Sequence, residues 1–591
     1  MSERSIETDG VEAPVVLGMV ASPPHKESTS DEFYFWAGRG VVVEKSAIVY
    51  ADCVLGGEPV RFYGLVSEVY RQGRPGSIAE AMDRHDGDLD YEPPLDVPGI
   101  TYAAVTILRT DPALMCPPTE GAKVYLGGEK EVAVAYAADE IEPGKALALG
   151  VVKNGGTRLA GPGHIDLDYL LGENGGHLNV NGVAGRGTKS SFLLHVIYLL
   201  LREARRQARE APSASDRLSV VPIILNVKNF DLFFIDRPST KFDARKHLDD
   251  WHALGVAEPK PFDGASFFAP QMKGSADPFD SGREGVTPYS WSLGEIIRDG
   301  LFRYLFADDD IADDNFQGIV LDIEARLTRE DRSKAQFRRT LDDQGGSVRT
   351  FEQAIAWVDR LVDDDGAKPL KKHHIGTLRK FQRRLAKVVH EGDGVLRRDD
   401  PAGHPLDVRS RETRGPRVID IHSLAATPGL QRFVVAAVFR QLVDERTGGR
   451  AVKGLKYLVM LDELNRFAPR EEKDPITRLI ETVAAEMRSQ GIILLGAQQQ
   501  ASLVSTRVFE NAGLKALGRS GSMEMGRDVW RFLGESARRK AQALDKTEKL
   551  LIQDGFREPM LVRIPMPPWA LNPGEQMPGP AHARVRDEFD E

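Results

Sequence analysis

The feature that most constrains the fold is a glycine-rich segment, residues 182–190, between two stretches of different character. Before it, residues 177–181, His-Leu-Asn-Val-Asn, are predicted to form a strand. After it, residues 190–209 are rich in Leu, Ala and Arg, which predicts a long helix. A strand, a glycine-rich turn and a helix in this order are typical of a parallel sheet covered by helices. We therefore expect an α/β domain built around this segment.

The same segment has the residue types that hold phosphate groups. Glycines let backbone N–H groups converge on phosphates, and the start of the helix adds the positive end of its dipole. We expect ATP and Mg²⁺ here, with Lys189 reaching the β and γ phosphates and Ser190 ligating the metal. The expected nucleotide contacts are Gly182, Gly185, Arg186, Gly187, Thr188, Lys189 and Ser190.

The spacing of this loop departs from the usual pattern. Thr188 and Val183 stand at the two positions where glycines are usual. Gly182 and Gly187 keep the usual mutual spacing, as though one threonine stood between the loop and its lysine. A glycine-rich helix start without a ligand is the alternative, so a second motif is needed.

Residues 458–463 supply the second motif. An apolar strand, Leu458-Val459-Met460-Leu461, ends in Asp462-Glu463. In open α/β folds ligands bind at the carboxyl ends of the strands, so both carboxylates are expected beside the phosphate loop. Asp462 is expected to hold the Mg²⁺ shell and Glu463 to polarise the attacking water. The alternative is a buried strand that ends in an exposed acidic turn without a catalytic role.

Together these motifs resemble those of the HerA–FtsK family of hexameric ATPases. Residues 461–469, Leu-Asp-Glu-Leu-Asn-Arg-Phe-Ala-Pro, are similar to that family's acidic motif. Residues 486–492 and 499–502 are similar to two motifs that follow it, although Gln500 and Ala501 replace Arg and Pro. Short apolar runs up to about residue 165, the run at 131–136 among them, predict strands, and residues 72–98 are expected to form a long loop. This β-rich start of the chain resembles the small barrel that precedes the HerA core. The resemblance covers most of the chain apart from residues 285–400.

The resemblance implies roles for further residues. Gln499 is the expected γ-phosphate sensor, because Ser502 then falls into register, and Gln498 is the alternative. Either glutamine could instead bond backbone at the end of a strand. Arg488 is the arginine that the motif match supports, in the same subunit or on a neighbour. Arg519 is a second candidate, for which an ordinary surface position is the favoured interpretation.

The expected fold class is α/β: a RecA-like P-loop ATPase sheet domain with a small N-terminal β-barrel and a helical insertion. The regions are the barrel (1–165), the first part of the ATPase core with the phosphate loop (166–284), a mainly helical insertion (285–400), the second part of the core with the acidic motif (401–572) and a C-terminal tail (573–591). The expected core strands are 177–181, 222–227, 418–421, 458–461 and 492–495. Lys228 and Asp231 follow the second strand and could line the channel or the nucleotide site, or cap a turn.

Charge limits the mode of DNA binding. Lys plus Arg number 78 against 88 Asp plus Glu, a formal net charge of −10, so a uniformly basic coat is excluded. One basic concentration comprises Lys368, Lys371, Lys372, Arg379, Lys380, Arg383, Arg384 and Lys387. A solvated helix face balanced by Asp363-Asp364-Asp365 is the favoured interpretation, and a surface that follows DNA phosphates is the alternative.

The two cysteines, Cys53 and Cys116, cannot form a disulfide framework, and free buried thiols in a reducing compartment are expected. No apolar run approaches the roughly 18 residues of a membrane span. The start of the chain lacks the basic leader of a signal peptide. We therefore expect a cytoplasmic protein without a membrane contact.

The expected function is that of an ATP-hydrolysing ring motor of HerA type. By the resemblance, it forms a homo-oligomer, expected to be a hexamer, and translocates double-stranded DNA without sequence specificity. A separate nuclease or effector subunit is expected, in DNA end processing or anti-phage defence. The alternative is an ATPase scaffold whose nucleotide state assembles or switches a partner effector without processive movement. A secretion or conjugation ATPase is disfavoured because the sequence shows no membrane anchor.

Overall fold

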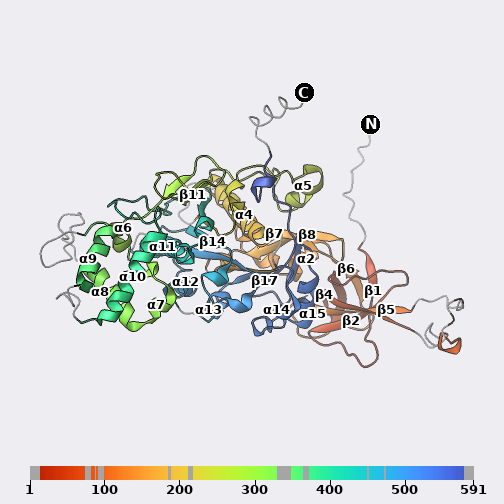
Figure 1. Ribbon diagram of the computed structural model, residues 1–591. Coiled ribbons are helices and arrows are strands. Elements are labelled where there is room, and N and C mark those ends of the chain that lie inside the picture. The colour runs from red at the N-terminus through yellow and green to blue at the C-terminus, as the bar shows by residue number, and fades with distance from the viewer. Residues whose placement is uncertain are drawn as a thin grey trace, which may run out of the picture.

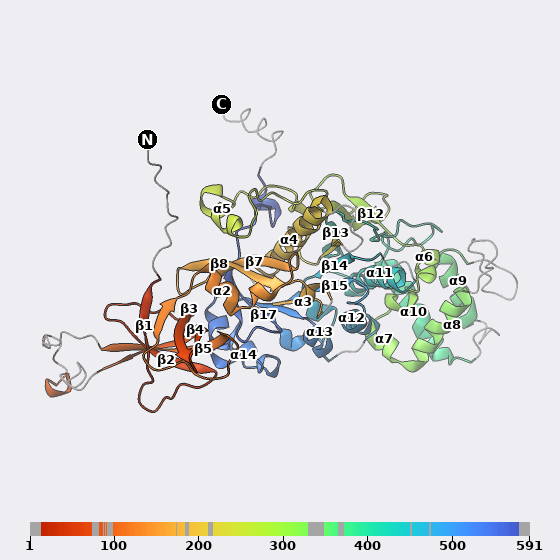
Figure 2. The same cartoon turned by 180° about the vertical axis from the view of Figure 1, so that it is seen from behind.

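A computed structural model describes residues 14–73, 82–86, 88, 90, 99–172, 174–183, 188–210, 217–328, 348–363, 372–448, 452–471 and 474–577. A β-barrel forms one end of the molecule, a large sheet covered by helices forms the middle, and a helical region forms the other end (Figure 1). The view from behind shows the same order (Figure 2). The predicted fold class is confirmed.

The barrel is closed by antiparallel pairing in the order β1-β2-β5-β4-β3-β6. Its strands are β1 (Val16–Val20), β2 (Glu32–Ala37), β3 (Ile48–Leu55), β4 (Glu58–Gln72), β5 (Ile100–Asp111) and β6 (Lys123–Leu126). Alternate residues point inward, as Phe33 and Phe35 of β2 do, and both are fully buried. Most of the expected loop at 72–98 lies outside the described residues.

The barrel ends earlier than the predicted boundary at residue 165. After β6 the chain forms helix α2 (Glu129–Ala135), where a strand over 131–136 was expected. The Glu131 carboxylate accepts a 2.9 Å hydrogen bond from Gly128 N, which caps this helix. The next two strands, β7 (Ala146–Lys153) and β8 (Leu159–Asp166), then join the edge of the large sheet, because β7 pairs with β18.

Within the described residues, the large sheet has 12 strands in the order β12-β11-β13-β10-β14-β15-β9-β16-β17-β18-β7-β8. All five predicted core strands are present and parallel: β9 (Leu178–Asn181), β10 (Ser219–Asn226), β13 (Arg417–Asp420), β14 (Leu455–Leu461) and β15 (Ile492–Gln498). The sequence interpretation missed β11 (Ser266–Pro270), β12 (Thr287–Tyr289) and β16 (Leu514–Leu517). The antiparallel pair β17 (Glu548–Gln553) and β18 (Met560–Arg563) extends the sheet.

Successive residues of the central strands face opposite sides of the sheet. Ile223 of β10 packs in one apolar cluster with residues of α11 (Pro428–Thr447) and α12 (Pro475–Glu486). Ile224 packs in a second cluster with residues of α4 (Thr188–Glu210) and α5 (Ala244–Ala253). The sheet is therefore buried on both faces, which explains the nearly continuous apolar runs of its strands. Short helices complete this region: α3 (Asp168–Leu171), α13 (Thr506–Glu510), α14 (Ser522–Met525) and α15 (Glu535–Ala543).

The insertion is helical, as predicted, with α6 (Leu293–Arg298), α7 (Asp308–Ala312), α8 (Asp314–Thr328), α9 (Phe351–Asp363) and α10 (Ile375–Glu391). The basic face of α10 is partly neutralised by carboxylates in and directly after α7. Lys380 and Arg384 form ion pairs with the buried Asp310, at 3.1 and 2.7 Å, and Lys380 also pairs with Asp313 at 3.3 Å. Lys368, Lys371, Asp364 and Asp365 lie outside the described residues.

Cys53 and Cys116 are free thiols, and both are half-buried rather than fully buried. In the part of the chain that the structure describes, every helix is too short or too polar to cross a bilayer. The first residues of the C-terminal tail lie against the core: Thr240 N donates a 2.8 Å hydrogen bond to Glu575 O.

Candidate nucleotide-binding site

The carboxyl ends of β14, β15, β9 and β16 lie side by side along one edge of the sheet. Gln498 of β15 is in register with Asn181 of β9, which is in register with Leu517 of β16 on its other side. The strands are parallel, so the segments that follow them leave the sheet at this same edge. This arrangement brings together the phosphate loop, the acidic motif and the glutamine pair, which are far apart in sequence.

Lys189 and Ser190 stand in the first turn of α4 and face this edge. The Lys189 ammonium is buried and donates a 3.2 Å hydrogen bond to the carbonyl of Gly182. Ser190 Oγ donates a 2.7 Å hydrogen bond to Asp462 Oδ2. Burial lowers the pKa of Lys189, because the charged form loses hydration there. Gly185, Arg186 and Gly187 lie outside the described residues, and Thr188 begins the helix.

The acidic motif turns sharply at the end of β14. Asp462 is buried, and its Oδ1 accepts a 2.8 Å hydrogen bond from Glu463 N. Glu463 has a left-handed backbone with φ of 56°, which is uncommon for a residue other than glycine. Strain of this kind is often found where a side chain must point in one direction for function. Here the turn separates the two carboxylates, so that each meets different partners.

Glu463 contacts two side chains from neighbouring strand ends. Lys228, two residues after β10, forms an ion pair with Glu463 Oε1, and Gln499 Nε2 donates a 3.2 Å hydrogen bond to the same oxygen. Burial raises the pKa of Glu463, but the hydrogen bond and charge of Lys228 outweigh burial and leave this pKa below its ordinary value. The sequence predicted that Lys228 follows a core strand at the ligand-binding edge, but it did not predict that Lys228 pairs with Glu463. Asp231 begins a short 3₁₀ helix nearby, and burial raises its pKa.

The two candidate glutamines have different environments. Gln498 is fully buried, and its amide exchanges hydrogen bonds with Asn179 of β9, at 2.6 and 3.3 Å. Gln499 is half-buried and reaches Glu463. Gln498 therefore joins two strands, whereas Gln499 faces the edge where a nucleotide would bind.

The two candidate arginines lie at opposite edges of the sheet. Arg488 precedes β15, and its side chain packs beside Gly176, just before the start of β9. The structure therefore does not bring Arg488 to Lys189 within one chain. Arg519 follows β16 at the same edge as the phosphate loop, and its carbonyl accepts a 2.8 Å hydrogen bond from Val183 N. The Arg519 side chain is exposed, as the favoured interpretation expected, while its backbone lies beside the start of the loop.

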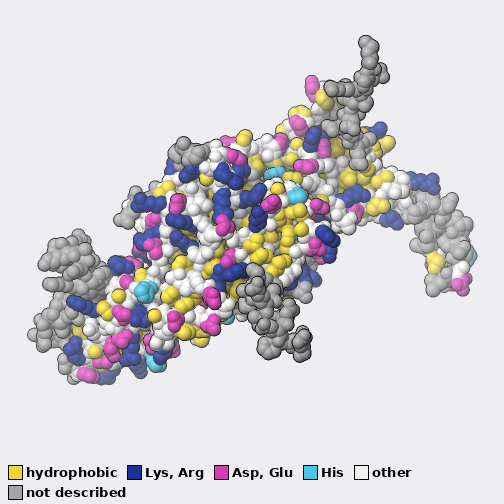
Figure 3. All heavy atoms as spheres, turned by 90° about the horizontal axis from the view of Figure 1, so that it is seen from above, with side chains coloured by type: hydrophobic (Ala, Val, Ile, Leu, Met, Phe, Trp, Pro, Cys, Tyr) yellow, Lys and Arg dark blue, Asp and Glu magenta, His cyan; other side chains and the backbone are white. Residues whose placement is uncertain are grey.

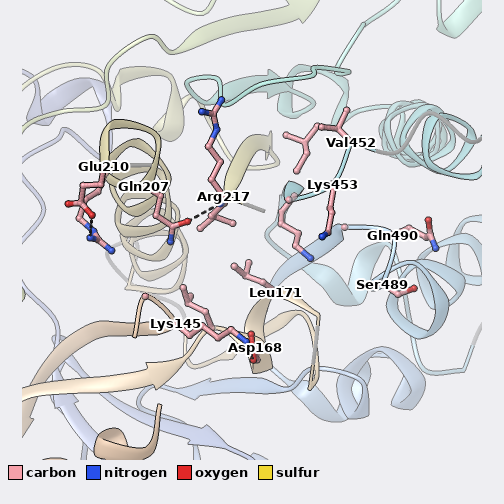
Figure 4. A pocket seen from close by; sticks show the side chains of 18 of the residues that line it. Lys145, Asp168, Leu171, Gln207, Glu210, Arg217, Val452, Lys453, Ser489 and Gln490 are labelled. Atoms are coloured by element: carbon pink, nitrogen blue, oxygen red, sulfur yellow. Dashed lines mark hydrogen bonds and ion pairs between the residues drawn. The ribbon is translucent and has the colours of Figure 1, made fainter. Parts of the chain in front are cut away.

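A cavity of about 880 Å³ opens at the opposite edge, near the starts of β10 and β14 (Figure 4). Lys145, Arg206 and Lys453 are among its basic residues. Lys145 forms a 2.8 Å ion pair with Asp168, and Arg206 pairs with Glu210, so part of this charge is neutralised. The surface seen from above likewise shows Lys and Arg interspersed with Asp, Glu and apolar side chains (Figure 3). This cavity shares no residue with the loop edge, where the phosphate loop meets the acidic motif.

No protein-family model and no curated protein sequence matches the chain. Its fold is similar to that of VirB4 of Thermoanaerobacter pseudethanolicus, at 15% identity and a TM-score of 0.44, over 72% of this chain and 98% of that one. It is also similar to the bacterial conjugative coupling protein TrwBdeltaN70, at 12% identity and a TM-score of 0.44, over 76% and 95% of the two chains. A third structure, the genome packaging NTPase B204 from Sulfolobus turreted icosahedral virus 2 in complex with ATP-gammaS, is 14% identical, with a TM-score of 0.20, over 25% and 68%.

The residues at the loop edge fit a nucleotide with Mg²⁺. A serine hydroxyl and a carboxylate, Ser190 and Asp462, are hard oxygen ligands of the kind that Mg²⁺ prefers. Within the described residues, the buried Lys189 ammonium has a hydrogen bond to a carbonyl and none to a carboxylate. A buried ammonium group without a hydrogen-bonded carboxylate is stabilised by an anionic ligand, such as the phosphates of a nucleotide.

Proposed function

We propose that the protein hydrolyses ATP as a ring motor of HerA type. The observation that carries this proposal is the contact between Ser190 and Asp462, because it joins the phosphate loop to the acidic motif at one sheet edge. The position of Glu463 beside Gln499 supports it further. The base that activates the water and the residue that senses the γ-phosphate must both lie near the γ-phosphate.

Glu463 would orient and polarise the attacking water. The water oxygen bonds to the γ-phosphorus, and the bond from that phosphorus to the bridging oxygen breaks. ADP leaves with the bonding electron pair, and the water's proton passes through the Glu463 carboxylate to solvent. Lys189 stabilises the charge on the phosphates, and Gln499 holds Glu463 in place.

Ser190 and Asp462 would hold Mg²⁺. When bound, the metal neutralises charge on the β and γ phosphates. Lys228 is paired with Glu463 here, and that contact must loosen before the carboxylate can engage water. Lys228 follows β10, so movement in that segment would control when the base is available.

We propose a hexamer for the assembled form. Arg488 lies at the edge away from Lys189, so it can assist hydrolysis only on a neighbouring subunit. The ring would translocate double-stranded DNA without sequence specificity, beside a separate nuclease or effector subunit, in DNA end processing or anti-phage defence. A cytoplasmic location is part of the same proposal.

The alternative is a scaffold whose nucleotide state switches a partner effector. The ion pairs of Lys380 and Arg384 with Asp310 favour it, because they reduce the charge that α10 can offer to DNA phosphates. Arg379 and Arg383 remain exposed on that helix.

Steady-state ATP hydrolysis with and without linear duplex DNA, at two salt concentrations, separates the two functions. The motor requires strong stimulation by duplex that fades at high salt. A hydrolysis rate that duplex DNA does not change, and that is lost in Glu463→Gln, supports the scaffold. No hydrolysis under any condition contradicts both.

A further inference from the structure

The side of the phosphate loop that faces away from Glu463 is formed by the segment after β16. Gly518 N donates a 2.8 Å hydrogen bond to Asn181 O, and Val183 N donates a 2.8 Å hydrogen bond to Arg519 O. These two bonds flank Gly182, the first glycine of the loop. The backbone of Gly518 and Arg519 is therefore fixed directly against the start of the loop.

The turn that carries Arg519 is held on its other side as well. Ser520 Oγ donates a 3.1 Å hydrogen bond to Gly518 O and accepts one of 3.1 Å from Asn181 Nδ2. Ser520 N donates a 3.0 Å hydrogen bond to Ala541 O. The Arg519 side chain itself is exposed and makes no hydrogen bond or ion pair with the described residues. A fixed backbone thus presents, at the start of the loop, an arginine that has no carboxylate partner among the described residues.

Lys549 adds a buried positive charge beneath this turn. It lies near the start of β17, is only 3% exposed, and its ammonium donates to the carbonyls of Lys546 and Glu548 at 3.3 and 3.1 Å. The Glu548 carboxylate is engaged by Lys153 instead. A Cβ at Gly518 would lie 3.4 Å from Lys549 Nζ, so the glycine leaves room for the ammonium.

Burial lowers the pKa of Lys549 to about 8, opposed by the charge of Glu548 and assisted by that of Lys189. The charges of two buried ammonium groups, Lys189 and Lys549, therefore repel each other. Carbonyls are their hydrogen-bond acceptors in the described part of the chain. Such groups are costly unless an anion compensates them. A bound polyphosphate would supply that anion.

Charge is distributed unequally about the loop. The β14–β15 side carries Asp462, Glu463 and Gln499, which suit metal, water and γ-phosphate. The β16–β17 side carries Arg519 and Lys549. Because the γ-phosphate must lie beside Glu463, the cationic side is left for the phosphates that ADP and ATP have in common.

We propose that Arg519 binds the phosphates shared by ADP and ATP within its own subunit, and that Lys549 is a positioning residue that supports this contact through its charge. The inference rests on the proposed nucleotide site and deepens it. Arg519 is thereby a nucleotide-binding arginine, distinct from an arginine that acts on the γ-phosphate of a neighbouring subunit.

The test is titration calorimetry of the full-length chain with Mg–ADP, and with Mg–ATP in a Glu463→Gln background that prevents hydrolysis. Arg519→Ala should weaken both nucleotides by the same factor, about ten- to a hundred-fold, as expected for a lost charged hydrogen bond. Arg209→Ala is the matched control, because Arg209 is an exposed arginine near the far end of α4. It should change neither affinity.

Two outcomes overturn the inference in different ways. If the unaltered chain binds both nucleotides tightly and Arg519→Ala does the same, the inference alone is wrong. If the unaltered chain binds neither nucleotide, the proposed function is wrong as well. A second test mixes Arg519→Ala chains with Glu463→Gln chains. If Arg519 acted on the neighbouring subunit, the mixture would regain hydrolysis. We expect that it does not.

Lys549→Met tests the positioning role through pH. The protonated form of Lys549 stabilises bound ADP through its charge. The ADP affinity of the unaltered chain should therefore fall between pH 7 and 9, as Lys549 loses its proton. This fall should be smaller in Lys549→Met. Glu548 and Lys189 are present in both proteins, so they do not account for a difference. An identical pH profile in the two proteins would overturn the role of Lys549. A purely structural role would lower stability without changing that profile.

Discussion

Ser190 Oγ lies 2.7 Å from Asp462 Oδ2, although the two residues are separated by 272 positions in the chain. The first belongs to the opening turn of α4 and the second to the end of β14. Their contact exists because β9 and β14 are both parallel to β15 in one sheet, with their carboxyl ends at one edge. It places two oxygen ligands suited to Mg²⁺ beside the buried Lys189.

Glu463→Gln is expected to abolish hydrolysis while preserving nucleotide binding. The amide keeps the size of the side chain but cannot accept the water's proton, and loss of such a base lowers kcat about 100-fold or more. The measurement is single-turnover hydrolysis together with Mg–ATP affinity. Glu471→Gln, in an exposed position after β14, is the control. Hydrolysis retained in Glu463→Gln would show that another group activates the water.

Lys228→Met is expected to move the acid limb of the pH profile of kcat/KM to higher pH, because kcat/KM reports the pKa of the free protein, in which Lys228 is paired with Glu463. Glu463 must be ionised to act, so activity is present above its pKa and is lost as pH falls through it. Lys228 keeps this pKa below its ordinary value, against the opposing effect of burial, so its removal raises the pKa. The limb is followed by hydrolysis rates between pH 4 and 8. Lys246→Met, which alters an exposed lysine of α5, should leave the limb in place. An unmoved limb in Lys228→Met would mean that this ion pair does not control Glu463.

Substitutions of the two neighbouring glutamines should have different effects, one on the stability of the fold and the other on the rate of hydrolysis. Gln498→Ala leaves the buried amide of Asn179 without its two hydrogen bonds, and we expect the free energy of unfolding to fall by about 2–4 kcal/mol. Gln499→Ala should instead lower kcat about ten- to a hundred-fold, since it removes the contact to Glu463. Chemical denaturation and steady-state kinetics measure the two effects. The reverse pattern would make Gln498 the sensor.

Asp310→Ala is expected to destabilise the helical insertion. The carboxylate is buried and is paired with Lys380 and Arg384 of α10. Its removal takes away the ion pair of Arg384 and leaves Lys380 with Asp313, 3.3 Å away. We expect a loss of about 2 kcal/mol, below the cost for fully buried pairs because both cations reach solvent. Urea denaturation measures the loss, with Arg379→Ala, on the exposed face of α10, as the control. Equal stability of the two variants would show that these ion pairs contribute little.

Local sequence was sufficient for the elements of the nucleotide site. Residues 177–181, the glycines after them and the Lys189-Ser190 pair predict a strand, a turn and a helix through short-range preferences. The Asp462-Glu463 pair was recognisable for the same reason, because it follows directly on a buried strand. These signals are periodic and local, so they survive without knowledge of the fold.

The boundary of the barrel could not be read in this way. The strands β7 and β8 have the composition of barrel strands, and their assignment to the large sheet depends on pairing between β7 and β18, more than 390 residues later. The short alternating run at α2 was mistaken for a strand because few residues distinguish the two periods. Pairing partners are a property of the folded chain.

By itself, the sequence determined the chemistry available to this protein: the phosphate loop, the acidic pair and the glutamines. Tertiary structure alone decided which of them meet. It separated Gln498 from Gln499, moved Arg488 to the far edge, and brought Lys228 to Glu463 and Arg519 to the loop. The physical reason is that parallel strands align their ends whatever their order in the chain, so contacts at that edge follow strand order in the sheet.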